Sequence, residues 1–201
     1  MDASTALREY TVALTSSPHN LVSDRDRALV ASRHVPECVA FAAILPELCT
    51  VVDIGAGGGL PGLVIAIVRP DLEVHLVESR AKKATFLQET ARAIGIRVTV
   101  HHARAEDSPV RGDIVTARAV APLHRLVGYA AAVTRAGGEL WAIKGDQWAG
   151  ELSEVTDFSG FVVVERPSDP PTRTVSTHLA PGVEVDLDVA PRVVRLRRQR
   201  T

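Results

Sequence analysis

Aromatic residues and cysteine are scarce in this chain. Only 4% of its 201 residues are aromatic, and its two cysteines are Cys38 and Cys49. A surface that stacks nucleobases needs clustered aromatic side chains, so the chain is not primarily a stacking platform. Two cysteines at this spacing provide neither a disulfide framework nor a metal-ligand pattern. We therefore expect small core cysteines in a cytoplasmic protein, and no metal site.

Long hydrophobic runs and a targeting segment are also missing. The longest apolar runs, such as Leu63 to Val68, are too short to cross a bilayer. The first residues lack the basic start and the apolar core of a signal peptide. We therefore expect no membrane partner. A hydrophobic share of 46% excludes a disordered chain, and 201 residues are enough for one ordinary domain.

Lysine is rare as well, because Lys82, Lys83 and Lys144 are the only ones. Arginine supplies the other positive charges, and it gathers in residues 25–34 and 192–200 of a chain whose net charge is −1. Basic ends can bind an anion locally, although such runs usually form solvated surface. No apolar seam for self-association is evident, so we expect a monomer.

Strands that alternate with helices predict an α/β fold. Helices are expected at 3–15, 24–32 and 36–45, and then at 62–68, 80–94, 122–134 and 146–155. Strands are expected at 50–54, 73–78, 97–102, 113–117, 139–144, 161–166 and 192–198. These βαβ units imply a mostly parallel, seven-stranded, Rossmann-like sheet, with the last two strands as an antiparallel pair at one edge. The proline-rich segment 167–185 is expected on the surface.

This pattern divides the chain into two parts within one compact domain. Residues 1–47 form an N-terminal helical extension, and residues 48–201 form the Rossmann-like core on which it packs. The change of periodicity after the third expected helix marks the boundary.

The most informative stretch runs from Val51 to Gly62, with the sequence VVDIGAGGGLPG. It predicts a buried strand that ends near Asp53, followed by a turn rich in glycine that opens a helix. Glycines such as Gly55, Gly57 and Gly59 allow backbone N–H groups to approach a ligand. The dinucleotide fingerprint requires another glycine where Leu60 stands, and no Gly-Lys-Ser/Thr follows, so neither a dinucleotide loop nor a P-loop is favoured.

An acid at the end of the next strand narrows the choice of ligand. Glu78 is placed to accept hydrogen bonds from both hydroxyls of a ribose. S-adenosylmethionine has a ribose but no pyrophosphate, so it fits the short turn best. Asp53 could receive its amino group, directly or through water, while Gly55 and Gly57 lie against its methionine and ribose. The loop with Ala105 and Glu106, after the third strand, is expected to face the adenine.

The loop 116–122, after the fourth strand, is where the methyl group should meet its acceptor. The Asp/Asn-Pro-Pro-aromatic motif of exocyclic-amine methyltransferases is absent there, and both cysteines precede the cofactor loop, which argues against a cysteine nucleophile. An acceptor with its own lone pair remains, such as N7 of guanine, and it requires no general base. Arg118 is best placed to orient either partner, unless it forms a structural ion pair.

These motifs resemble those of one family, the ribosomal RNA small-subunit methyltransferase G family, also called glucose-inhibited division protein B. The resemblance covers roughly residues 18–145 and rests on four motifs in the family's order and spacing. They are GAGGGLPGL at 55–63, RAE at 104–106, ARA at 117–119 and IKG at 143–145. The chain departs from the family at Glu37-Cys38-Val39, where the family has Asp-Ser-Leu.

The resemblance implies a class I S-adenosylmethionine-dependent methyltransferase that modifies N7 of one guanine in 16S ribosomal RNA, in a stem-loop near the decoding centre. Its partner would be 16S ribosomal RNA or the small ribosomal subunit, and loss of the family's activity is linked to low-level streptomycin resistance. The family's cofactor contacts fall on Gly55, Leu60, Ala105, Glu106 and Arg118. We add Lys144, from the fourth motif, as a second candidate for positioning the substrate.

Three other functions remain as alternatives. A small-molecule methyltransferase would share the cofactor site, although the basic N-terminal segment favours RNA. A dinucleotide-binding oxidoreductase of the NAD type is disfavoured by Leu60 and by the lack of a Tyr-x-x-x-Lys pair. An RNA-binding module without catalysis would leave Asp53 and Glu78 unexplained.

Overall fold

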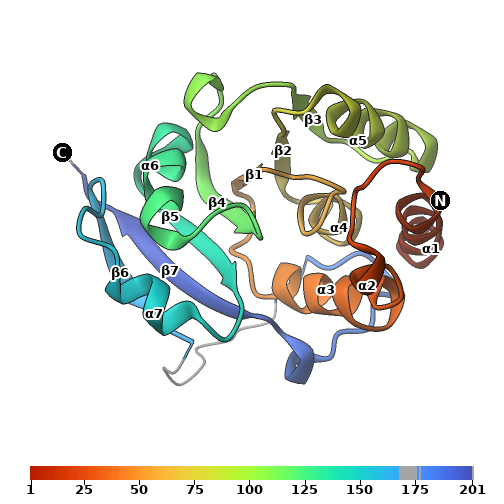
Figure 1. The fold of residues 1–201 in the computed structure, drawn as a ribbon. Helices are drawn as coiled ribbons and strands as arrows, with labels where there is room; N and C mark the ends of the chain where they lie inside the picture. The colour runs from red at the N-terminus through yellow and green to blue at the C-terminus, as the bar shows by residue number, and fades with distance from the viewer. Residues whose placement is uncertain (168–175, 177, 201) are drawn as a thin grey trace.

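The computed structural model describes residues 1–167, 176 and 178–200, and a seven-stranded sheet lies at its centre (Figure 1). The strand order is β3-β2-β1-β4-β5-β7-β6, in which β7 is antiparallel to β5 and β6 and the other pairs are parallel. The strands are β1 Thr50–Ile54, β2 Glu73–Val77, β3 Thr99–His101, β4 Gly112–Arg118, β5 Thr134–Lys144, β6 Phe161–Glu165 and β7 Arg192–Arg198. This confirms the predicted Rossmann-like α/β fold with its antiparallel closing pair.

Helices cover both faces of the sheet (Figure 1). The α-helices are α1 Ala3–Ser16, α2 Asp24–Arg27, α3 Val35–Ala43, α4 Gly62–Val68, α5 Ala81–Ile94, α6 Leu123–Val133 and α7 Trp148–Ser153. Successive side chains of a strand point to opposite faces. Val51 accordingly packs in the apolar cluster of α1, α3, α4 and α5, whereas Val52 packs in the cluster of α6. Burial on both faces explains why the central strands are rich in valine, isoleucine and leucine.

The N-terminal helix α1 packs against the glycine-rich turn. The Asp2 side chain caps α1 by accepting a hydrogen bond from the Thr5 N–H at 2.9 Å. Further along, Tyr10 is fully buried, and its hydroxyl donates to the Gly58 carbonyl at 3.0 Å. A Cβ atom at Gly58 would lie 2.6 Å from Leu14 Cδ1. A side chain at this position would therefore force Leu14 to move.

The single helix predicted over 24–32 is wrong. Helix α2 begins after Ser23, whose side chain caps it as the sequence indicates, but it ends at Arg27. A π-helical turn, η1 Val30–His34, follows and leads directly into α3. A π-turn forms hydrogen bonds five residues apart, so the 3.6-residue periodicity used for the prediction does not indicate it.

The described residues of the segment 167–185 are exposed or partly buried except for Ser176, as expected for a surface segment, and several of them contact the core; residues 168–175 and 177 lie outside the description. The Ser176 N–H donates to the Ala43 carbonyl at 2.7 Å, and the Ala180 N–H donates to the Val68 carbonyl at 2.8 Å. These carbonyls end α3 and α4, where a helix leaves its last C=O groups without partners of its own. The segment therefore satisfies two helix ends.

The arginines near the C-terminus belong largely to β7 and form ion pairs. The Glu139 carboxylate accepts from Arg195 at 2.9 Å and from Arg197 at 2.7 Å. The Trp141 indole N–H also donates to Glu139 at 2.8 Å, and the Arg195 guanidinium lies 4.2 Å from the centre of the Trp141 ring. Burial acts to raise the pKa of Glu139, but these donors outweigh it and lower that pKa. Arg195 and Arg197 thus stabilise the pairing of β5 with β7.

Candidate cofactor and substrate site

The glycine-rich turn connects the end of β1 to α4, and three of its glycines adopt the left-handed backbone conformation. The φ angles are +63° at Gly55, +57° at Gly57 and +99° at Gly59. A Cβ atom at Gly55 would lie 2.8 Å from Val120, in the loop after β4, and one at Gly59 would lie 2.6 Å from Leu63. Both backbone conformation and close packing therefore demand glycine here.

Asp53 lies beneath this turn and is 1% exposed. Its Oδ2 accepts the Gly62 N–H at 3.0 Å, and its Oδ1 accepts the Thr116 hydroxyl at 2.9 Å. Burial raises the pKa of Asp53 to about 7, although both hydrogen bonds act in the opposite direction. The carboxyl group thus joins the start of α4 to β4, and its contact with a cofactor amino group stays a prediction.

Glu78 follows β2 and is 5% exposed. Its Oε2 accepts the Gly57 N–H at 2.9 Å, and its Oε1 accepts the Arg80 N–H at 2.8 Å. The carboxylate therefore fixes the turn to the end of β2. Because each ionised carboxylate oxygen has two lone pairs, Glu78 retains capacity for the hydroxyls of a ribose.

A cavity of about 370 Å³ borders the turn, and we call it the glycine cavity. Its volume lies within the range of small-molecule pockets. It is lined by Leu21, Val22, Ser23, Asp26, His34, Gly55, Ala56, Gly57, Gly58, Leu60, Lys83, Arg118 and Ala119. The structure thus brings together four of the predicted cofactor residues, Gly55, Gly57, Leu60 and Arg118. Five predicted cofactor residues do not line this cavity: Ala105 and Glu106, which lie in the short helical turn η2 Ala105–Asp107, and Asp53, Gly59 and Glu78, of which Glu78 is joined to the lining through the Gly57 N–H.

A second cavity, of about 860 Å³, lies beyond the loop that follows β4, and we call it the charged cavity. Its ionisable residues are Arg33, Glu37, Arg118, Lys144, Asp146, Glu151 and Arg192. Arg118 and Ala119 line both cavities. The φ angle of Ala119 is +54°, an uncommon conformation for alanine. These two residues form a partition between the cavities.

The ammonium group of Lys144 is engaged within the charged cavity. Its Nζ donates to the Ala121 carbonyl at 2.8 Å and pairs with Glu151 at 2.7 Å. Glu151 also accepts the Leu123 N–H at 2.9 Å. Lys144 thereby connects β5 and α7 to the loop after β4 and to the start of α6. One ammonium hydrogen remains for a ligand, so the predicted role in positioning the substrate stays a prediction.

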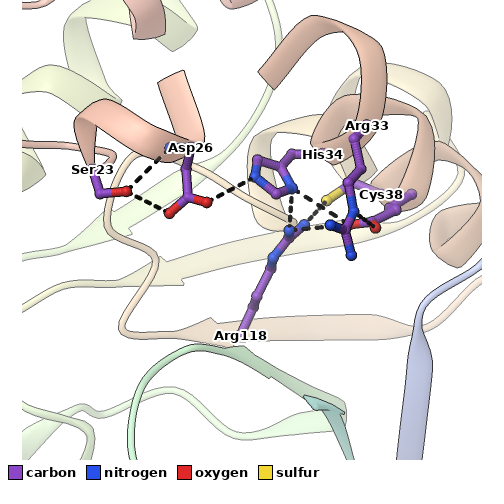
Figure 2. Close-up of polar contacts among 7 residues, drawn as sticks. Ser23, Asp26, Arg33, His34, Cys38 and Arg118 are labelled. Atoms are coloured by element: carbon purple, nitrogen blue, oxygen red, sulfur yellow. Dashed lines mark hydrogen bonds and ion pairs between the residues drawn. The ribbon is translucent and has the colours of Figure 1, made fainter. Parts of the chain in front are cut away.

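Arg118 extends from the end of β4 to the N-terminal helices, where three side chains face it (Figure 2). Its guanidinium lies 2.7 Å from His34 Nδ1, 3.1 Å from the Glu37 carboxylate and 3.3 Å from Cys38 Sγ. Arg33 Nε donates to the other Glu37 oxygen at 2.7 Å. Burial acts to raise the pKa of Glu37, but the hydrogen bond from Arg33 and the charge of Arg118 lower it overall. Arg118 therefore forms an ion pair with Glu37, the structural alternative that the sequence left open, and this pair lies within the site.

Ser23 and Asp26 extend this network, and the sequence prediction missed them as site residues. His34 Nε2 lies 3.5 Å from an Asp26 oxygen, and the Ser23 hydroxyl donates to the other Asp26 oxygen at 2.6 Å. The sequence indicated both residues only as the start of a helix. The basic run 25–34 was the signal in the sequence that pointed to this segment.

Other features of the described chain are less suited to chemistry. No group of three or more His, Cys, Asp or Glu side chains within residues 1–167, 176 and 178–200 is placed to hold a metal ion. Over the same residues, no helix has the length and apolarity that crossing a membrane requires. A groove of about 610 Å³ lies between α1 and α5, but none of the predicted cofactor or positioning residues lines it.

The sheet order, the glycine turn after β1 and the acid after β2 define the fold of the class I methyltransferases. A solved structure of this class, the mitomycin 7-O-methyltransferase MmcR, superposes with a TM-score of 0.61 at 18% identity, over 87% of this chain and 56% of that one. At this identity the likeness concerns the fold alone.

Residues 5–166 match the family model of rRNA small subunit methyltransferase G, and the chain belongs to this family. It is 42% identical over 137 residues to ribosomal RNA small subunit methyltransferase G of Thermobifida fusca, covering 67% of this chain and 58% of the relative. It is 47% identical over 114 residues to the protein of the same name from Acidothermus cellulolyticus, covering 56% and 51%. The chain thus spans between half and three fifths of the length of these relatives.

Proposed function

We propose that this protein transfers a methyl group from S-adenosylmethionine to N7 of a guanine in 16S ribosomal RNA. The observation on which this depends is the pair of cavities on either side of Arg118 and Ala119. One cavity borders the glycine turn and the other borders the loop after β4. A donor and an acceptor could therefore meet at this partition. The names of the relatives supply the RNA as substrate.

The glycine cavity suits the cofactor. The left-handed glycines keep side chains away from the turn, and a Cβ atom at Gly57 would have no protein atom within 3.4 Å. Glu78 would bind the ribose, Leu60 offers an apolar surface, and Asp26 places a carboxylate in the lining. When bound, S-adenosylmethionine supplies a methyl group that its sulfonium activates.

The chemistry asks little of the protein beyond orientation. Guanine N7 has a lone pair and no proton, so no general base is needed. The residues of the partition would fix the acceptor, and Arg118 can donate to a ligand from the N–H groups that remain to it. We further propose that the protein acts as a monomer in the cytoplasm.

The test is methylation of total ribosomal RNA with radiolabelled S-adenosylmethionine, followed by mapping of the labelled nucleotide. We expect one labelled guanine in 16S RNA, modified at N7. At limiting RNA concentration, the rate of methylation should fall steeply as the salt concentration rises. The reason is that contacts to RNA phosphates release counterions, which makes binding dependent on salt. A label only in small molecules would favour the small-molecule alternative.

A further inference from the structure

The guanidinium of Arg118 is the one charged group that lines both cavities in the described part of the chain. Its side chain is 17% exposed, and its partners belong to η1 and α3, more than 75 residues earlier in the sequence. The end of β4 therefore determines only where the Arg118 side chain begins. The N-terminal helices determine where its charge lies.

Among the three partners, His34 makes the shortest contact, at 2.7 Å. Glu37 lies farther, at 3.1 Å, and it is shared with Arg33. Cys38 offers a sulfur atom, which is a weak acceptor. His34 is thus the strongest partner of Arg118 that no second arginine shares in the described contacts.

The chemistry of the two groups fixes the tautomer of His34. A guanidinium nitrogen has only hydrogens to donate, so Nδ1 of His34 accepts in the 2.7 Å contact with Arg118, which is shorter than its 3.5 Å separation from the Glu37 carboxylate. The ring hydrogen then belongs to Nε2, which faces Asp26 at 3.5 Å. Ser23, in turn, donates to Asp26 at 2.6 Å. Figure 2 shows the resulting series from Ser23 through Asp26 and His34 to Arg118.

We infer that His34 is a positioning residue, whose Nδ1 accepts from the Arg118 guanidinium and holds it at the partition in the orientation that methyl transfer requires. This inference rests on the proposed function. His34 would act through Arg118 and not on the reacting atoms. Three of the five guanidinium N–H groups donate to His34, Glu37 and Cys38, so two remain for the cofactor or the RNA.

A double-mutant cycle tests this dependence. We expect His34→Ala to lower kcat for RNA methylation at least tenfold, with the KM for RNA changed less than threefold. His34→Asn, whose amide oxygen can take the place of Nδ1, should restore kcat to within threefold of the wild type. In an Arg118→Ala background, His34→Ala should have less than a twofold effect. The exposed His19 supplies a control, because His19→Ala removes an imidazole that touches neither Arg118 nor Asp26.

Equal losses in the two backgrounds, or no rescue by asparagine, would overturn the inference. A second measurement does not depend on activity. The ¹⁵N spectrum of the wild-type imidazoles, with His34 assigned by its absence in His34→Asn, should show Nδ1 without hydrogen and Nε2 with it. A hydrogen on Nδ1 would also overturn the inference. If the wild type fails to methylate RNA, the proposed function fails, while the spectrum still tests the contact.

Discussion

The buried carboxyl group of Asp53 should make the stability of this protein fall as pH rises from 3.8 to about 7. Its pKa is about 7 in the folded protein and 3.8 in the ordinary case. Between these values the folded state holds a proton that the unfolded chain has lost, so the free energy of unfolding decreases with pH. The stability linked to Asp53 is therefore fully present below pH 3.8 and is lost by about pH 7.

The size of the effect follows from the same two values. A difference of about three pKa units corresponds to about 4 kcal/mol over the whole range, and to about 2–3 kcal/mol between pH 5 and pH 8. Asp53→Asn removes the titration while its amide preserves both contacts. The amide oxygen can accept the Gly62 N–H, and the amide N–H can donate to the Thr116 hydroxyl, which is also an acceptor.

Urea unfolding of the wild type and of Asp53→Asn, followed by circular dichroism at pH 5 and pH 8, measures the difference. Relative to the wild type, the variant should gain about 2–3 kcal/mol on going to pH 8. Asp113→Asn is the control, because the pKa of Asp113 lies below its ordinary value and its charge does not change over this range. If the difference between the wild type and Asp53→Asn were the same at both pH values, the reasoning would be refuted.

Three further predictions concern the turn and the core. Glu78→Ala should weaken S-adenosylmethionine binding by about 1–3 kcal/mol in calorimetry, whereas Glu89→Ala, on the exposed side of α5, should leave the affinity unchanged. If Glu78→Ala bound the cofactor as tightly as the wild type, the ribose contact would be rejected. Gly59→Ala should lower the free energy of unfolding by about 1–3 kcal/mol, because the new Cβ atom would meet Leu63. Gly128→Ala, in an exposed and open position of α6, should raise the free energy of unfolding by about 0.5–1 kcal/mol. A change of the same sign in both variants would contradict the packing argument. Arg69→Ala should lower the free energy of unfolding in urea by about 3–5 kcal/mol, because it removes a buried guanidinium that donates to three carbonyls at and after the end of α3 and pairs with the Asp71 carboxylate. A loss below 1 kcal/mol would contradict this.

The sequence predicted the sheet well because its signals are local. The strands β1 and β7 and the helix α4 have the bounds expected from their apolar runs and turn residues. The turn 55–59 was predictable because the left-handed conformation requires glycine, whatever the rest of the chain does. The acid after β2 followed from the rule that ligands bind at the carboxyl ends of parallel strands.

The partners of those residues could not be predicted in the same way. That Asp53 would face Thr116, or that Arg118 would face His34, depends on how segments more than 60 residues apart pack together. The π-helical turn η1 obeys no simple periodicity, and Ser23 and Asp26 looked only like a helix start. Composition and spacing contain no information about such distant contacts.

The two cavities draw on different stretches of the chain, and this separation bears on how the protein can diverge. The glycine cavity uses no residue after Ala119, whereas much of the charged cavity comes from residues 120–192. Under the proposed function, substitutions in the later half would alter which nucleotide is admitted without changing the residues that bind the methyl donor. Related proteins could acquire new RNA targets through such substitutions, whereas a substitution at Arg118 or Ala119 would affect both cavities.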